Sequence, residues 1–169
     1  LLSLALGVLS PEYVPLEVVQ RDIRLGRELG IPCSMHTGSG GAHGGIQKLA
    51  SADLLGPDLN FAHCNTLLEE EYRLITSNGC SVTMTPEVEM QMGLGMPATR
   101  NVLDSGGRPS LGVDVVTAVS GDLFTQMRLT LQSDRAQANA SRLQQGEIPE
   151  SLDLTARDVL EFATIEGAR

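Results

Sequence analysis

The segment Pro32-Cys33-Ser34-Met35-His36 is the first of three short, largely apolar runs that end in a side chain able to bind a metal or polarise a bond. The other two are Leu59-Asn60-Phe61-Ala62-His63 and Ser110-Leu111-Gly112-Val113-Asp114, and a turn and a helical pattern follow each run. In a parallel barrel, the strand ends and the loops after them form one rim, where active sites lie. We therefore expect the two histidines and the aspartate to converge on one rim. Two imidazoles and a carboxylate in that arrangement favour metal-assisted hydrolysis.

Apolar runs of strand length alternate with helical patterns along the whole chain, which is typical of βα units and a parallel sheet. The expected strands are Leu2–Leu9, Cys33–His36, Leu59–His63, Ser81–Thr85 and Ser110–Asp114. With their helices they predict an α/β fold, a partial TIM (β/α)8 barrel of about strands four to eight, as a single incomplete domain over residues 1–169. A doubly wound sheet is the alternative, because its ligands also bind beyond the carboxyl ends of strands.

Local signals predict where the helices begin and end. Thr66 and Glu69 have the spacing of a capping box, which opens the helix after the third strand. Pro86–Met96 is expected to be a loop before a helix that Pro97 opens. Thr155 and Asp158 are expected to cap the last helix. A long helix from about residue 122 to residue 139 is expected to carry an apolar inner face, formed by Phe124, Met127 and Leu131.

Length and composition narrow the class of protein. The 169 residues suffice for one domain but fall short of a full α/β barrel, which takes about 250. With 12 basic and 21 acidic residues and a formal charge of −9, neither nucleic acid nor an anionic membrane is an expected partner.

The apolar run Leu1–Leu9 is too short to span a bilayer, and a cytoplasmic location is expected. Both ends look cut, so we expect a fragment. The three cysteines, at unrelated spacings, are expected to be reduced core residues: Cys33, Cys64 and Cys80.

A glycine-rich loop, Gly38–Gly45, follows the second strand. It would let the backbone approach a ligand closely. A phosphate cradle is one interpretation, although the loop lacks the Gly-Lys-Ser/Thr ending of a P-loop. A mobile substrate loop is the preferred interpretation, in which His43 either contacts substrate or is simply solvated.

Acidic residues follow two other strands. Glu87 and Glu89 come after the fourth strand and are expected to meet a polar substrate, such as an amidine or a ring N–H, or else to lie in an acidic surface loop. Asp114 stands among apolar neighbours and is expected to be partly buried. Because an unpaired buried charge is unfavourable, a metal, a cation or a histidine should lie beside it, or backbone N–H groups of the following loop should donate to it.

At these residues the sequence resembles the metal-dependent amidohydrolase superfamily, in the branch of cytosine deaminase-like, guanine deaminase-like and triazine hydrolase-like enzymes. His36 resembles the family's strand-five histidine, His63 its strand-six histidine, and Asp114 its strand-eight aspartate. The closing segment Ala163–Ala168 is similar to the last barrel helix. The resemblance implies one divalent metal, zinc or iron, held by a His-x-His pair on strand one together with His36 and Asp114. It also implies that Asp114 takes a proton from the metal-bound water and that His63 polarises that water.

The chain departs from the family pattern at two points. The His-x-His pair is absent from it, and Thr37-Gly38-Ser39-Gly40 stands where many deaminases of this branch carry a glutamate that protonates the substrate ring. The sequence thus predicts a fragment, inactive alone, of a metal-dependent hydrolase that acts on a non-peptide C–N bond of a small cyclic amidine or N-heterocycle. Self-association, or association with the missing barrel half, is expected because five strands cannot close a barrel. The alternatives are a catalytically inactive barrel homologue and a phosphate- or nucleotide-binding α/β domain that uses the Gly38–Gly45 loop.

Overall fold

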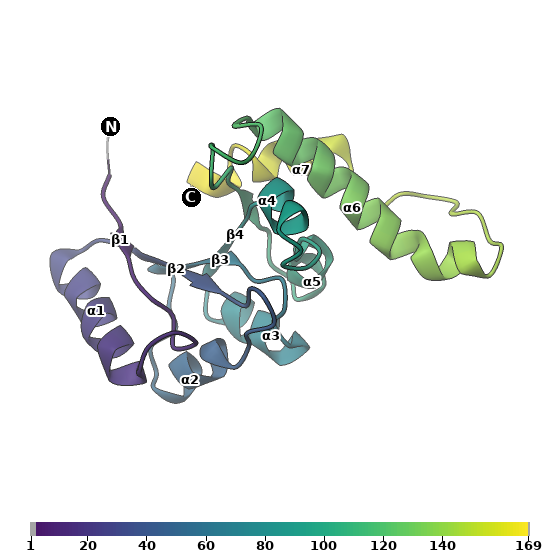
Figure 1. Ribbon diagram of the computed structural model, residues 1–169. Coiled ribbons are helices and arrows are strands. Elements are labelled where there is room, and N and C mark those ends of the chain that lie inside the picture. The colour runs from purple at the N-terminus through teal and green to yellow at the C-terminus, as the bar shows by residue number, and fades with distance from the viewer. Residues whose placement is uncertain (1–2, 169) are drawn as a thin grey trace.

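The computed structural model describes residues 3–168, which build one five-stranded parallel sheet with its strands in sequence order (Figure 1). The strands are β1 (Leu6–Gly7), β2 (Cys33–Thr37), β3 (Leu59–His63), β4 (Ser81–Met84) and β5 (Ser110–Leu111). The two outer strands are shorter than the expected Leu2–Leu9 and Ser110–Asp114, since each pairs with one neighbour through two residues only. Residues 1 and 2 lie outside the described residues.

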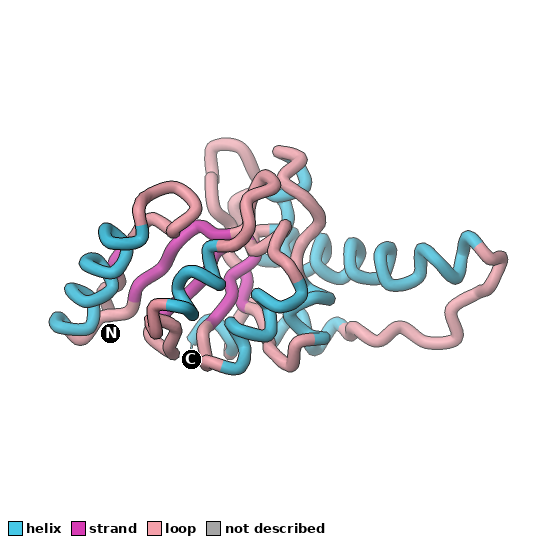
Figure 2. The backbone as a smooth tube through the Cα atoms, turned by 90° about the horizontal axis from the view of Figure 1, so that it is seen from below, coloured by secondary structure: helices cyan, strands magenta, loops and turns pink. Residues whose placement is uncertain are grey.

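Helices follow the strands in turn and lie along one side of the curved sheet (Figures 1 and 2). They are α1 (Leu16–Leu29), α2 (Gly45–Ser51), α3 (Glu69–Ser77), α4 (Pro86–Gln91), α5 (Thr99–Asp104), α6 (Leu123–Gln144) and α7 (Ala156–Phe162), with a closing 3-10 turn at Glu166–Ala168. A doubly wound sheet would reverse its strand order and carry helices on both faces. The sequential order therefore confirms the expected barrel sector and not its alternative.

Strand alternation gives the sheet two different faces. The face toward the helices is apolar, each of its side chains being at most 3% exposed: Cys33, Met35, Leu59, Phe61, Val82 and Met84. The other face carries small polar side chains that bond across strands. Asn60 Nδ2 donates to Ser34 Oγ at 2.9 Å, Thr83 Oγ1 donates to Asn60 Oδ1 at 2.9 Å, and the Thr83 and Ser110 hydroxyls lie 2.8 Å apart. These residues line an open hollow of about 600 Å³ near the amino ends of the strands.

The expected capping box of α3 is wrong. The helix begins at Glu69, and Glu71 rather than Glu69 reaches back to accept from the Leu68 N–H at 3.1 Å. Thr66 instead donates its hydroxyl to Ala42 O at 2.8 Å, because the turn before α3 packs against the glycine-rich loop. The capping box at Thr155 and Asp158 is confirmed.

Two expectations about the later helices are also wrong. Pro86–Met96 is not all loop, because α4 occupies Pro86–Gln91 with the proline in its first turn, where a missing N–H does no harm. Phe124 is 79% exposed, whereas Met127 and Leu131 do pack against the core. The inner side of α6 is largely polar because it meets charged groups of α4 and α5, and its buried residues are Gln126, Thr130, Ser133, Asp134 and Asn139.

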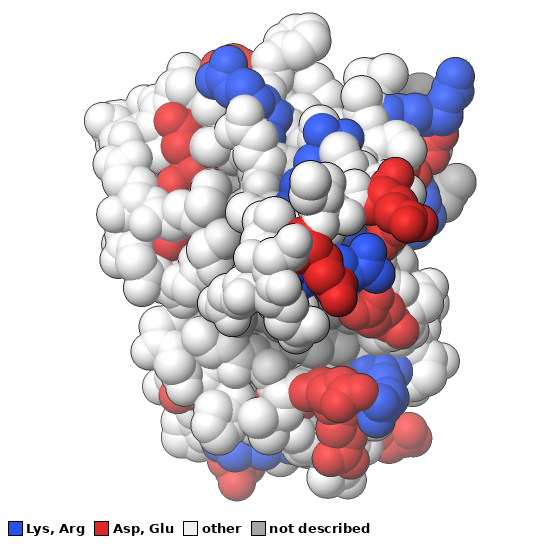
Figure 3. Space-filling view, turned by 90° about the vertical axis from the view of Figure 1, so that its right-hand side faces the viewer, with Lys and Arg blue, Asp and Glu red and all other residues white. Residues whose placement is uncertain are grey.

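The surface carries charges of both signs. On the face shown in Figure 3, basic and acidic side chains lie beside one another and form no single basic field. None of the helices within residues 3–168 combines the length and the apolar character that a membrane-spanning helix requires.

Candidate active site at the carboxyl ends of the strands

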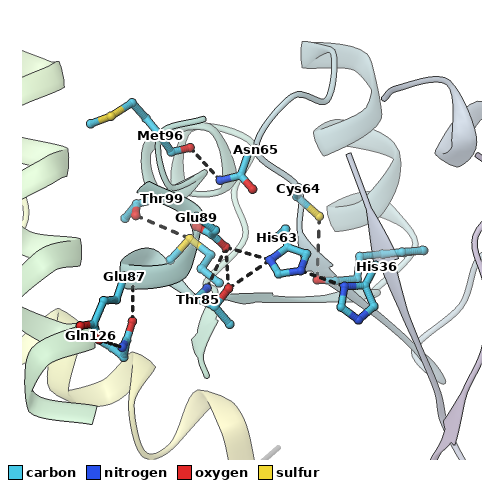
Figure 4. Close-up of polar contacts among 12 residues, drawn as sticks. His36, His63, Cys64, Asn65, Thr85, Glu87, Glu89, Met96, Thr99 and Gln126 are labelled. Atoms are coloured by element: carbon cyan, nitrogen blue, oxygen red, sulfur yellow. Dashed lines mark hydrogen bonds and ion pairs between the residues drawn. The ribbon is translucent and has the colours of Figure 1, made fainter. Parts of the chain in front are cut away.

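His36 and His63, from the adjacent strands β2 and β3, contact each other at the carboxyl end of the sheet (Figure 4). His36 Nδ1 lies 2.9 Å from His63 Nε2, and the ring centroids are 4.9 Å apart. His36 is exposed, whereas His63 is only 4% exposed. The structure thus brings together the two histidines that the sequence placed on one rim.

A strained turn places His63. The backbone φ angles of His63 and Cys64 are +75° and +60°, in the left-handed region that non-glycine residues rarely adopt. Three hydrogen bonds hold this turn: Cys64 N donates to Thr37 O at 2.9 Å, Thr66 N donates to Gly38 O at 2.8 Å, and the Tyr72 hydroxyl donates to Cys64 O. The left-handed backbone ends the extended alternation of β3. Strain maintained in this way is concentrated at functional sites.

The opposite edge of the His63 ring faces α4. His63 Nδ1 lies 3.0 Å from Thr85 Oγ1 and 3.3 Å from Glu89 Oε1. Glu89 is fully buried, and its Oε1 also accepts from the Thr85 N–H at 2.8 Å. Its Oε2 has no hydrogen-bond partner among the described residues. Glu89, expected to meet substrate, therefore reaches the back of a rim histidine instead (Figure 4).

Glu87 points away from the histidines, toward α6. Its carboxylate accepts from Ser120 Oγ at 2.6 Å, from the Ser120 N–H at 3.1 Å and from Gln126 Nε2 at 2.9 Å. Its own N–H donates to Gln126 Oε1 at 3.0 Å. Glu87 thus links the loop before α6, and α6 itself, to α4.

Asp114 lies beyond the end of β5, where the ladder extends one step as Gly112 N donates to Met84 O at 2.8 Å. It is exposed, not partly buried as expected, and has a left-handed φ of +67°. The burial expectation fails because β5 ends at Leu111 and the chain then leaves the sheet. Within residues 3–168, no group of three or more His, Cys, Asp or Glu side chains is arranged to hold a metal ion.

Carboxylates of the chain itself occupy the backbone N–H groups of the glycine-rich loop. Glu12 accepts from the Gly38 N–H at 3.0 Å, and Glu71 accepts from the Gly44 N–H at 2.9 Å and the Ile46 N–H at 3.2 Å. Burial raises the pKa of Glu12, and the charge of nearby Glu71 raises it further. Two carboxylates beside these donors would repel a phosphate, so the geometry argues against a phosphate cradle. His43 of this loop is exposed.

The donor set fits part of a metal site and not a whole one. Imidazole and carboxylate are suitable ligands for zinc or iron, but a catalytic zinc usually has three protein ligands and a water. His36 and Asp114 supply two at most. Any complete site would need ligands from outside the described residues.

Sequence reasoning missed the contacts behind His63. Thr85 and Glu89 are four residues apart, which brings their side chains together only if a helix begins at Pro86. The Thr-Pro-Glu pattern is itself a helix-start signal, so recognising it would have placed Glu89 on the first turn of α4.

Comparison with curated sequences finds deaminases. A 5'-deoxyadenosine deaminase of Methanococcoides burtonii is 26% identical over 125 residues, covering 73% of this chain and 26% of the relative. A 5-methylthioadenosine/S-adenosylhomocysteine deaminase of Shouchella clausii is 28% identical across 95% of this chain and 37% of its own length. The chain therefore spans between 26% and 37% of the length of these curated relatives. No family model matches the chain.

Comparison with solved structures supports the same fold. The zinc complex of an atrazine chlorohydrolase from Arthrobacter aurescens TC1 has a TM-score of 0.80 at 20% identity, covering 97% of this chain and 37% of that one. A zinc-bound adenosine deaminase from Xanthomonas campestris has a TM-score of 0.76 at 23% identity, covering 97% and 38%. The fold is that of the C-terminal part of amidohydrolase barrels, and the resemblance to this superfamily is confirmed.

Proposed function

We propose that this chain is part of a metal-dependent hydrolase that cleaves a non-peptide C–N bond of a small N-heterocycle. The observation that carries the proposal is the contact between His36 and His63 at the carboxyl ends of β2 and β3, with a buried carboxylate behind the second ring. Active sites of parallel barrels lie at this rim. The deaminase relatives and the zinc-bound structures of the same fold support the reaction class.

In this proposal, His36 and Asp114 are two of the ligands of a divalent metal, with zinc favoured, and residues outside this chain supply the others. A bound divalent ion lowers the pKa of water toward neutrality. Asp114 accepts the proton that water loses as its oxygen bonds to the ring carbon. Asp114 then donates that proton to the leaving nitrogen as the C–N bond breaks. His63 acts through His36 in this proposal, because its Nε2 lies 2.9 Å from His36 Nδ1 and so orients that ring.

The substrate class follows from the relatives and from what this chain lacks. The curated relatives are named for 5'-deoxyadenosine and 5-methylthioadenosine, so an amino-substituted ring is the proposed substrate. Thr37-Gly38-Ser39-Gly40 offers no carboxylic acid after His36 to protonate a ring nitrogen. A suitable panel therefore pairs aminopurine nucleosides with amino-substituted triazines, which need different degrees of ring activation.

A catalytically inactive barrel homologue is the second candidate. It is favoured by the lack, within residues 3–168, of a group of three or more ligating side chains that could hold a metal ion.

Self-association stays a prediction, because β5 has a free edge within the described sheet and the polar face is open. Sedimentation that shows a stable monomer at all concentrations would contradict it.

The test is steady-state turnover of a longer, metal-loaded protein that contains this chain, measured on the panel. Asp114→Asn should lower turnover by about 10²–10⁴-fold, because a neutral amide cannot accept the proton of water. Asp104→Asn is the matched control, since Asp104 is an exposed aspartate at the end of α5. Undiminished turnover in Asp114→Asn would remove Asp114 from the mechanism. A wild-type protein that binds metal but turns over no member of the panel would favour the inactive homologue.

A further inference from the structure

A chain of hydrogen bonds runs from a buried carboxylate to an exposed imidazole. His63 Nδ1 lies 3.3 Å from Glu89 Oε1, and His63 Nε2 lies 2.9 Å from His36 Nδ1. We propose that Glu89 is a positioning residue that fixes the tautomers of His63 and His36 through this chain and leaves the lone pair of His36 on Nε2. The use of that lone pair as a metal ligand rests on the proposed function, but the tautomers do not.

The direction of each hydrogen bond in this chain is assigned by starting from the Glu89 carboxylate, because an ionised carboxylate only accepts hydrogen bonds. Glu89 Oε1 accepts from the Thr85 N–H at 2.8 Å and from the Thr85 hydroxyl at 3.2 Å. The assignment gives the one hydroxyl proton of Thr85 to the Glu89 carboxylate, so that both oxygens near His63 Nδ1 are acceptors. With this assignment, His63 Nδ1 carries a proton.

The remaining assignments follow from the chemistry of imidazole. A neutral imidazole has one donor nitrogen and one acceptor nitrogen. Because Nδ1 of His63 donates, its Nε2 accepts, and the donor facing it is His36 Nδ1 at 2.9 Å. The lone pair of His36 then lies on Nε2, on a side chain that is exposed at the rim.

The burial of Glu89 supports a positioning role and not a substrate contact. Its side chain is fully buried, and its second oxygen has no hydrogen-bond partner within residues 3–168. A buried carboxylate with an unpaired oxygen is unfavourable, and such groups in native structures call for an explanation. Metal-binding histidines are commonly oriented by an acceptor at the other ring nitrogen. Here His63 is that acceptor, and Glu89 orients His63.

The test is the tautomeric state of the histidines, read by two-dimensional ¹H–¹⁵N NMR of the ¹⁵N-histidine-labelled chain without metal. At about pH 8.5, free histidine side chains are neutral. His36 and His63 should both be in the Nδ1–H form, whereas exposed His43 should show the Nε2–H form that free histidine favours. An Nε2–H form at His36 or His63 in the wild-type chain overturns the proposal without recourse to any variant.

Variants assign the effect to Glu89. Glu89→Gln keeps an oxygen for the Thr85 N–H and for His63, so it should retain the Nδ1–H forms. Glu89→Met removes the acceptor and should give mixed tautomers at both rings. Glu87→Gln is the matched control, because Glu87 lies on the same helix and bonds to Ser120 and Gln126. Its histidine signals should match those of the wild type. A folded Glu89→Met chain with wild-type tautomers would overturn the role of Glu89.

Metal affinity provides a readout that separates this proposal from the proposed function. In a longer protein that binds zinc, Glu89→Met should weaken zinc binding by about 10-fold or more, and Glu89→Gln should restore most of it. Unchanged zinc affinity in Glu89→Met would overturn the link from Glu89 to the ligand nitrogen. The wild-type longer protein could instead turn over no member of the panel while His36 and His63 keep their Nδ1–H forms. That result would overturn the proposed function and leave the role of Glu89 standing.

Discussion

The two sides of the rim differ in how completely this chain builds them. On the histidine side, β2 pairs with β3 along all five residues, and His63 is buried between His36 and Glu89. On the aspartate side, β5 pairs through two residues, has a free edge within the described sheet, and is followed by exposed Asp114. The difference teaches that contacts within the chain orient the histidines, whereas exposed Asp114 follows a strand that is held to the sheet through only two residues.

The largest loss of stability is expected on the histidine side, from substitutions of Tyr72. This buried residue donates its hydroxyl to Cys64 O in the strained turn. Burial raises the pKa of Tyr72, so the hydroxyl keeps its proton. Tyr72→Ala should lower the free energy of unfolding by about 3–5 kcal/mol, from the cavity and the lost packing. Tyr72→Phe should lower it by about 1–2 kcal/mol, because Cys64 O loses its donor.

Urea unfolding of both variants measures these changes. Tyr13→Ala is the control and should change stability by less than about 0.5 kcal/mol, because Tyr13 is 52% exposed. A Tyr72→Ala effect as small as that of the control would show that the turn does not depend on this anchor.

A smaller effect is expected at Asp134, which anchors α6 behind the aspartate side. Its carboxylate, 1% exposed, bonds to Arg100 Nη2 at 2.7 Å and Nε at 3.1 Å. Asp134→Ala leaves a partly buried guanidinium without this partner, so stability should fall by about 1–3 kcal/mol. Asp153→Ala is the matched control, because Asp153 is 71% exposed and 3.7 Å from the same arginine. Equal thermal unfolding of the two variants would show that α6 is not held by this pair.

The smallest expected effect lies away from both sides, at the ion pair of Arg27 and Asp58. The Arg27 guanidinium bonds to the carboxylate at 2.8 Å and holds the pKa of Asp58 below its usual range. The resulting stabilisation is present above the unfolded pKa, near 3.8, and is lost as pH falls through the folded value. Because Arg27 is 38% exposed, Asp58→Asn should remove no more than about 1 kcal/mol at neutral pH.

The pH dependence of urea unfolding checks the sign. The difference in free energy of unfolding between the wild type and Asp58→Asn should narrow as pH drops below about 4. A gap that widens under acid conditions would contradict the assignment of this carboxylate.

The sequence predicted the histidine side better than the aspartate side for a physical reason. His36 and His63 lie at or next to the last residue of their strands, so their position at the carboxyl end of the sheet follows from the strand pattern. Alternation alone would put the two side chains on opposite faces, and the left-handed turn at His63 is not encoded in the period of the strand. The contact of Glu89 with His63 was missed because it requires α4, which the sequence pattern suggested was a loop. The exposure of Asp114 was missed because it depends on where β5 loses its partner, which alternation does not encode.

The glycine-rich loop shows a second limit of sequence reasoning. Its composition suggested mobility or anion binding, but Glu12 and Glu71, distant in sequence, hold its N–H groups. Such contacts arise only when the turn before α1, which carries Glu12, and α3 pack beside the loop. They could not be inferred from the glycines themselves.

The most direct test of the central claim is a zinc-edge anomalous map from crystals of a longer, zinc-loaded protein that contains this chain. The map should place one zinc ion at the rim, about 2.0–2.1 Å from His36 Nε2 and about 2.0–2.2 Å from an Asp114 carboxylate oxygen. His63 should lie outside the coordination sphere, with its Nδ1 directed at Glu89. Zinc bound away from His36, or bound through His36 Nδ1, would contradict the claim that this chain presents a pre-oriented ligand to a hydrolase metal site.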